Sequence, residues 1–393
     1  MLRGLGAPGG RTLKTENARV SLPEAEESEG IIAEGARELS PSGFGKKHVR
    51  ALLGSVVIVA IFVWVMKRGS LPMLPPAGLL AKVDGVLVFG FVLGMLSHLL
   101  LRFVRVYYLT APIAHVPLRR LMTINAITMV IINVLPLRLG EMARPAMLRK
   151  QGHLSGWAVT GTVFAERIID GIVYTGALLL GLVLAPPHEP LPTSVGKLPV
   201  PASLVPQAGR VAALGFVGAF VVMVIFYRYR AFAVNVTERT IGVVSVKLGE
   251  RVAAAVGRLS DGLSFLTNFR YMVPYVGITF LSALSHIWAI ELLGHAVGLP
   301  ELTLAQSTLV VGVLSLGFAL PNAPGFFGAV QLALYAGLAV YVTPEEVIGP
   351  GAVLVFIFYI TYLGLVSSLG ALAVAVEYWA PSPEPRARER EVG

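Results

Sequence analysis

The composition of this 393-residue chain excludes an ordinary soluble domain. Hydrophobic side chains make up 55% of it and charged ones only 14%, against about 25% in typical soluble proteins. The mean hydropathy is +0.73. The net charge of +9 does not indicate nucleic-acid binding, because most basic residues lie between apolar segments, where they set membrane topology. Since there is no cysteine, disulfides and thiolate metal sites are excluded, and we expect a membrane protein.

Residues 1–45 predict a disordered cytoplasmic tail, because glutamate, glycine and proline occur there without a sustained apolar period. No apolar stretch begins within them, so a cleaved signal peptide is not expected. Lys46, Lys47 and Arg50 precede the first apolar stretch and predict a cytoplasmic N-terminus. A second cytoplasmic tail is expected over residues 381–393. Its basic residues are Arg386, Arg388 and Arg390.

Eight apolar segments follow one another in a single transmembrane domain expected over residues 46–380. Most are long enough to cross about 30 Å of hydrocarbon as a helix. The sequence therefore predicts an all-α fold, a polytopic bundle of membrane helices. The segments are residues 51–66, 83–101, 121–137, 157–184, 205–227, 272–298, 302–341 and 351–376.

Two segments are interrupted by proline and glycine, which stop a helix. The third ends in LPLRLG at residues 135–140, and the seventh contains LPNAPG at residues 320–325, so both fit Leu-Pro-x-x-x-Gly. The seventh segment is too long for one span, and we expect two short helices or a broken hairpin there. The residues expected to permit these breaks are Pro136, Gly140, Pro321, Pro324, Gly325 and Gly328.

The distribution of basic residues predicts the side on which each loop lies. Residues 228–271 are rich in arginine and lysine and belong inside, whereas the proline-rich residues 185–204 contain only Lys197 and belong outside. Basic residues flank the third segment on both sides, at 102–120 and 138–156, so this segment should enter and leave on one side. Two re-entrant elements that enter from opposite faces suggest an inverted repeat, which many transporters use to build a site near the midplane.

An amphipathic helix is predicted between the fifth and sixth spans, because apolar residues recur there every three or four positions. Arginines and lysines occupy its other faces. Two interpretations stay open, a helix packed under the bundle and an interfacial helix on the anionic inner leaflet. The apolar stripe consists of Ile241, Val244, Leu248, Val252, Val256, Leu259, Leu263 and Leu266.

The fourth span carries Glu166, Arg167 and Asp170 roughly 14 to 20 Å along an apolar helix. An unpaired charge at the centre of a membrane helix costs about 3 kcal/mol, so these side chains must face protein or water. Helical spacing places Glu166 and Asp170 on one polar stripe with Thr162 and Tyr174, and Arg167 can pair with Asp170 one turn later.

The loop that follows Pro136 offers partners for these carboxylates, namely Arg138, Glu141 and Arg144. If these basic residues neutralise the carboxylates and one guanidinium remains unpaired, its N–H groups match the geometry of phosphate oxygens and it stays charged. Pro145 predicts a helix start near Arg144, and the free amides of that helix would also favour an anion. Two roles stay open, a closed salt-bridge network that only locks the loop and a site that also binds a ligand.

Other polar residues in apolar segments give weaker indications. We expect Asn125 and Asn133 to form hydrogen bonds between helices. Glu291 and His295 offer too few ligands for a metal, and we prefer a locally satisfied His286 to one in a proton relay. No cofactor or metal is expected. The chain has no Walker loop, Gly-x-Ser-x-Gly or His-Glu-x-x-His motif, so ATP-driven pumping and common hydrolase chemistry lack support.

Three ordered motifs resemble the lysylphosphatidylglycerol synthase transmembrane region, also called the flippase-like family. They are NVLPLRLGE at residues 133–141 with Arg144, Glu-Arg-x-x-Asp at 166–170, and Pro-x-x-Pro-Gly-x-x-Gly at 321–328. The resemblance covers roughly residues 50–378. It implies a module similar to the flippase half of the bacterial multiple peptide resistance factor, which moves aminoacylated phosphatidylglycerol to the outer leaflet.

The resemblance implies a role in lipid translocation or export. Phe326 and Gln331 stand where many members have glycine and glutamate, which argues against an acidic role of the second break. No soluble aminoacyl-transferase domain follows residue 378, so lysyl transfer is not expected. The resemblance carries over the following candidate headgroup or gating residues: Arg138, Glu141, Arg144, Glu166, Arg167 and Asp170.

Three functions remain open on the sequence. The first is an inner-membrane translocase that binds a phosphate-bearing lipid, a phospholipid or a polyprenyl phosphate, and lets its headgroup cross through a polar cleft. The second is a proton-coupled transporter of a small polar solute, with Glu166, Asp170 and His286 as the relay. The third is a membrane transferase that uses a lipid-linked donor, with Glu166 or Asp170 as the base.

Overall fold

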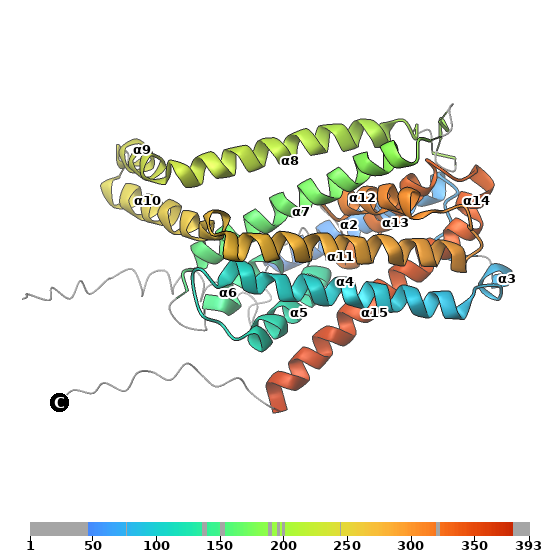
Figure 1. Cartoon of the computed structure of the whole chain (residues 1–393), viewed down its shortest axis with the longest axis horizontal. Coiled ribbons are helices and arrows are strands. Elements are labelled where there is room, and N and C mark those ends of the chain that lie inside the picture. The colour runs from blue at the N-terminus through green and yellow to red at the C-terminus, as the bar shows by residue number, and fades with distance from the viewer. Residues whose placement is uncertain are drawn as a thin grey trace, which may run out of the picture. The chain divides into compact units, whose positions relative to one another are not determined.

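The structure is a computed structural model, and its described part is a polytopic bundle of membrane helices, which confirms the all-α prediction (Figure 1). The helices from Arg50 onward form one unit. Both predicted tails lie outside the described residues. The structure describes residues 46–75, 77–135, 140–149, 154–187, 191–194, 197–198, 201–243, 245–319 and 323–379.

Five stretches of helix in the described chain are long and apolar enough to cross a membrane. They are α4 (Gly85–Thr110), α7 (Gly156–Leu184), α8 (Leu204–Arg228), α11 (Phe269–Ala296), and α14 (Pro344–Ile348) together with α15 (Pro350–Trp379). The other helices are α2 (Lys46–Arg68), α3 (Ala77–Leu80), α5 (Leu118–Val134), α6 (Ala143–Arg149), α9 (Arg230–Gly242), α10 (Val246–Asp261), α12 (Leu304–Ala319), α13 (Ala329–Leu338) and the 3₁₀ helices η3 (Ser264–Thr267) and η4 (Pro324–Phe326).

Helix α4 is longer than the second predicted segment. It begins after Asp84, whose carboxylate caps the helix by accepting a hydrogen bond from the N–H of Val86 at 2.8 Å. It ends only at Thr110, so Arg102 and Arg105 lie inside the helix. The sequence had instead predicted a basic cytoplasmic loop from residue 102 onward. That prediction was wrong because two charged residues lower the local hydropathy, whereas the helix continues and buries Arg105 to 1% exposure.

Helices α5 and α6 form the re-entrant element predicted for the third segment. Gly140 lies so close to α5 that an added Cβ would be 2.5 Å from the backbone nitrogen of Ile132, so the chain doubles back after the break. Leu148 of α6 packs in one cluster with Leu121 near the start of α5. The element therefore enters and leaves at the same end. Pro136 lies outside the described residues.

Helices α12 and α13 form the broken hairpin predicted for the seventh segment. An added Cβ on Gly317 of α12 would be 2.9 Å from the carbonyl oxygen of Ala329, and one on Gly337 of α13 would be 3.2 Å from the Cα of Val310. The two helices therefore run antiparallel and lie in close contact. Pro321 lies outside the described residues.

In the described part of the link between these helices, residues 323–328, three residues have positive φ: Gly325 at 68°, Phe326 at 56° and Gly328 at 84°. Glycine adopts this conformation readily, whereas a phenylalanine there is strained. Pro324 opens η4, the short 3₁₀ turn within the link. The break thus depends on backbone conformation as well as on missing backbone donors.

Helices from the N-terminal half of the chain pack against helices from the C-terminal half. Helices α4 and α11 run antiparallel, with the N–H of Asp84 donating to the carbonyl of Ala296 at 3.0 Å and the hydroxyl of Ser285 to that of Gly94 at 2.9 Å. Helix α5 packs on α15, and α12 packs on α7. Each re-entrant helix thus contacts the long helix of the other half, as a repeat of inverted topology would produce.

The described residues of the amphipathic stripe are divided between α9, α10, η3 and the turn before η3, so the prediction of one helix was wrong. Figure 1 shows α9 and α10 as separate helices, and Val244 lies outside the described residues. Ser245 separates α9 from α10 and caps α10 by accepting a hydrogen bond from the N–H of Leu248. Helix α10 packs against α9 and α7, and an added Cβ on Gly262 would overlap the carbonyl of Ala158. Close packing on α7 favours the interpretation of a helix under the bundle.

Candidate functional site

Arg105 of α4 lies at the centre of a buried charge network. Its guanidinium donates to both carboxylate oxygens of Asp170, at 2.5 and 2.7 Å, and to Glu166 at 2.9 Å. It also donates to the hydroxyl of Thr279 at 3.2 Å and lies 5.5 Å from the ring centroid of Tyr275. Because the two carboxylates are one turn apart on α7, a single guanidinium reaches both. This pairing offsets much of the cost of burying three charges.

Arg144 of α6 approaches Glu166 from the other side and forms an ion pair with its second oxygen. The sequence predicted an ion pair between the loop after Pro136 and the carboxylates of α7, and Arg144 forms one with Glu166. Arg138 lies outside the described residues. The predicted pairing of Arg167 with Asp170 is replaced by contacts to other carboxylates. Arg167 lies 3.7 Å from Glu141 and 3.8 Å from Glu166.

Two arginines lie at the edge of the network and are less tightly held. The side chain of Arg102 is 22% exposed and lies 3.6 Å from Asp170, and that of Arg167 is 29% exposed. Their distances to carboxylate oxygens exceed those of good hydrogen bonds. Both therefore keep donor capacity for a ligand, whereas the guanidinium of Arg105 is 1% exposed and committed to its partners.

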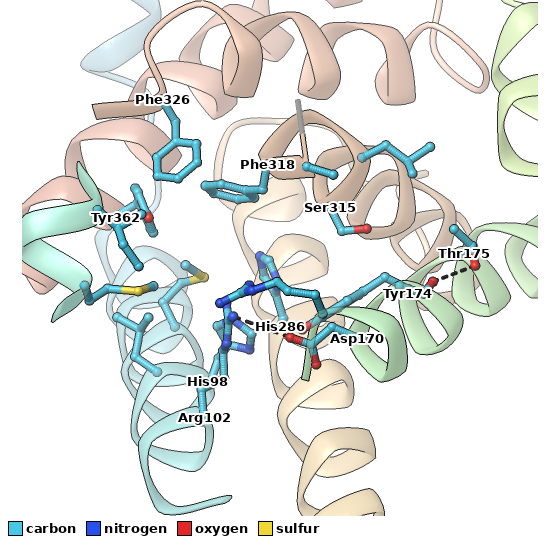
Figure 2. Close-up of a pocket in the computed structure, with 18 of the residues that line it drawn as sticks. His98, Arg102, Asp170, Tyr174, Thr175, His286, Ser315, Phe318, Phe326 and Tyr362 are labelled. Carbon is cyan, nitrogen blue, oxygen red and sulfur yellow. Dashed lines mark hydrogen bonds and ion pairs between the residues drawn. The ribbon is translucent and has the colours of Figure 1, made fainter. Parts of the chain in front are cut away.

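A cavity of about 320 Å³ opens beside this network (Figure 2). Figure 2 shows two kinds of wall, with Arg102 and Asp170 on one side and Phe318, Phe326 and Tyr362 on the other. The lining side chains come from α4, α5, α7, α8, α11, α12, η4 and α15 and from the turn at Glu141. The cavity is thus amphipathic, charged at one end and aromatic at the other.

Both breaks contribute to this cavity. Phe326 of η4 packs edge to face on Phe318 of α12, with 5.0 Å between ring centroids, and Phe318 lies 5.2 Å from Tyr362 of α15. The amide of Asn133, just before the first break, donates to the hydroxyl of Tyr362 at 3.3 Å. Asn125 donates to a backbone carbonyl of α4 at 3.5 Å, so both asparagines bond between helices as expected.

His98 of α4 and His286 of α11 form part of the cavity wall, with ring centroids 4.4 Å apart. Neither ring nitrogen of His286 has a hydrogen-bond partner within the described chain, so the expectation of a locally satisfied histidine was wrong. His295 is exposed, away from this pair. No group of three or more His, Asp or Glu side chains in the described part of the chain could hold a metal ion.

Sequence reasoning missed His98, Arg102 and Arg105 as site residues. They recur at positions i, i+4 and i+7 and therefore share one face of a helix, a spacing visible in the sequence. The spacing is not decisive, because arginines beside an apolar segment are also typical of a cytoplasmic loop. Of the six candidate headgroup or gating residues predicted from the sequence, the structure brings together five: Glu141, Arg144, Glu166, Arg167 and Asp170.

The fold and the site define a class of polytopic membrane proteins in which two broken helices border a charged, amphipathic cavity. The family model described as the lysylphosphatidylglycerol synthase TM region matches residues 52–368. The chain belongs to this lipid-related family. No curated protein and no solved structure gave a significant match.

Proposed function

We propose that this chain is a translocase of the inner membrane that moves or exports a phosphate-bearing lipid. The observation that carries the proposal is the two-sided cavity, charged on one wall and aromatic on the other. A phospholipid or a polyprenyl phosphate has the same two parts, an anionic headgroup and an apolar body. In this proposal residues 46–380 form the flippase-like domain between two cytoplasmic tails.

The charges around the cavity favour an anionic headgroup. Four guanidinium groups and three carboxylates make up the described network, so its net charge is four minus three, or +1. Arg102 and Arg167 supply the donors, since their contacts to carboxylates are long and their side chains are partly exposed. A phosphate between them gains charge-assisted hydrogen bonds. The network consists of Arg102, Arg105, Arg144 and Arg167 with Glu141, Glu166 and Asp170.

The size of the cavity suits a headgroup and not a whole lipid, because 320 Å³ is at the small end of the range of about 300 to 1,000 Å³ for ligand pockets. The acyl or prenyl chains must therefore stay in the bilayer. Helix α8 is where they would leave, since only Pro206, Gly209 and Met223 of this helix are buried. Its Phe216 lines the cavity and packs directly on Gly171, beside the charged network.

The charge distribution supports a cytoplasmic location for both termini. The helices α6, α9 and α10 lie at one end of the bundle (Figure 1), and the basic residues of 228–271 belong to that end. Helix α15 also ends there, because Glu377 pairs with Arg120 near the start of α5. Basic loops face the cytoplasm in membrane proteins.

The other two functions fit the site less well. Glu166 is 1% exposed and lies within ion-pair distance of three guanidinium groups, so it is poorly placed to act as the base of a transferase. A small polar solute would gain nothing from the aromatic wall of Phe318, Phe326 and Tyr362.

We expect Arg167→Gln and Arg102→Gln each to slow lipid movement about tenfold, because each removes a charge-assisted hydrogen bond. The measurement is the translocation rate of fluorescently labelled phosphatidylglycerol in vesicles that contain the purified full-length chain. Thermal stability should change little, since both side chains are partly exposed and loosely paired.

Arg228→Gln is the matched control, because this arginine is exposed at the end of α8, outside the cavity. Its translocation rate should equal that of the unchanged chain. Equal rates in all four proteins would contradict the assigned roles of Arg102 and Arg167, and no movement of labelled lipid by the unchanged chain would contradict the proposed function.

A further inference from the structure

The charged network leaves a pair of buried histidines without a role. His98 and His286 are 4% and 5% exposed, and their rings are tilted by 35° at a centroid distance of 4.4 Å. Both line the cavity that Arg102 and Asp170 also line (Figure 2). A proton on either ring would therefore be a charge in the wall of the proposed headgroup site.

The hydrogen bonds of His98 fix its tautomer. Its Nδ1 lies 3.0 Å from the backbone carbonyl of Ser282, which can only accept, and 2.9 Å from the hydroxyl oxygen of the same residue. That hydroxyl donates its own proton to the backbone carbonyl of His98 at 3.2 Å. The neutral ring must then carry its proton on Nδ1, which leaves the lone pair on Nε2. His98 can therefore accept a second proton.

His286 is held by stacking instead of hydrogen bonds. Its ring contacts the rings of His98 and Phe358; the centroid of Phe358 is 6.0 Å away, and the planes of these two rings differ by only 16°. A neutral imidazole has one donor and one acceptor, and within the described chain both nitrogens of His286 lack a partner. Buried polar groups are seldom left unpaired without a functional reason.

The groups that face the pair carry charges of both signs. Cations come from α4, and α7 contributes one anion together with a cation at the cavity edge. The cavity-lining residues that belong to α5, α12 and η4 are uncharged. The charged or titratable groups around the pair are Arg102, Arg105, Asp170, Arg167, Glu141, Tyr174 and Tyr362.

We propose that the His98–His286 pair binds a proton when an anionic headgroup occupies the cavity. A proton on the pair adds positive charge beside Arg102, and the negative charge of a bound phosphate offsets that repulsion. By linkage, the proton and the anion each strengthen the binding of the other. The inference rests on the proposed function and adds to it a coupling of lipid transport to a proton gradient. A pH difference across the membrane would make the affinity for the lipid differ between the two sides.

The test measures binding of dioctanoyl phosphatidylglycerol to the full-length chain in detergent between about pH 5 and 8, a range in which the phosphodiester keeps one negative charge. We expect calorimetry to show affinity rising as pH falls, by up to about tenfold per pH unit for one coupled proton. Binding in weak buffer should also take up protons from solution.

Two variants test whether the histidines are the source. His98→Phe with His286→Phe keeps the stacked rings and should bind the probe with the same affinity at every pH, and His286→Gln should weaken the pH dependence. His295→Gln, an exposed position on the same helix, should behave like the unchanged chain.

The results distinguish this inference from the function on which it rests. If the unchanged chain binds the probe with an affinity that does not vary with pH, or if the double variant keeps the full pH dependence, the coupling is refuted while lipid binding stands. If the unchanged chain binds no probe at any pH, the proposed function itself fails.

Discussion

Arg105→Met is expected to lower the free energy of unfolding by about 3 to 5 kcal/mol, because it removes one partner of a buried ion network. Asp170 would lose both of its bonds to this guanidinium and keep only the contact of 3.6 Å to Arg102. Glu166 would keep Arg144 and the contact of 3.8 Å to Arg167. A carboxylate without a directly hydrogen-bonded cation would then be buried in the bundle. Since a domain is stable by only about 5 to 15 kcal/mol, this loss is a large share of the total, and the variant should melt well below the unchanged chain.

The measurement is unfolding of the purified protein in detergent, followed by circular dichroism. Arg230→Met is the matched control, because it breaks an ion pair of 3.3 Å with Asp261 in which both side chains are more than half exposed. That change should cost no more than about 1 kcal/mol. A double variant, Arg105→Met with Asp170→Asn, should recover part of the loss, since it removes the carboxylate that loses both of its bonds to Arg105. Equal effects of the two single arginine variants would contradict a structural role for the buried network.

Replacing the glycine at either break with alanine should also destabilise the protein, for different physical reasons at the two positions. At Gly140 the new Cβ would be 2.5 Å from the nitrogen and 2.6 Å from the Cα of Ile132, so the turn must open at a cost of about 1 to 3 kcal/mol. At Gly328 the residue has φ of 84°, and the Cβ would overlap the ring of Phe62. Strain and overlap together should cost about 2 to 5 kcal/mol.

Thermal unfolding of the two alanine variants in detergent checks these values. Gly215→Ala and Gly218→Ala on α8 are the controls, because an added Cβ meets nothing within 4 Å at either position. Alanine should there be neutral or stabilise the helix by roughly 0.5 to 1 kcal/mol. Should Gly140→Ala and Gly328→Ala melt like these controls, the glycines would not be what the breaks require.

The two matches to Leu-Pro-x-x-x-Gly show how far a sequence motif reaches. The spacing predicted two breaks, and both are present after α5 and after α12. It did not reveal that the glycines differ in use. Gly140 allows close approach of two backbone segments, whereas Gly325 has φ of 68°. Both the close approach and the backbone conformation depend on the residues that pack around the turn. The motif does not contain those residues.

The charged site was predicted in part for a similar reason. Burial of Glu166 and Asp170 followed from their position in an apolar helix, because ionised groups cannot face hydrocarbon without partners. Their principal partner, Arg105, lies 61 residues from Glu166 and 65 from Asp170 in the chain. No helical period links residues so far apart. Only the packing of α4 against α7 and α11 decides that they meet.

The sequence by itself determined that the chain crosses a membrane, that it is helical and where its helices break. These properties depend on hydropathy and on the local chemistry of proline and glycine, which are encoded over spans of one or two helices. The tertiary structure alone decided which arginines are committed to carboxylates, that His98 stacks on His286, and that the charged and aromatic walls border one cavity. Those properties arise from contacts between distant helices, where burial and electrostatic pairing select one arrangement.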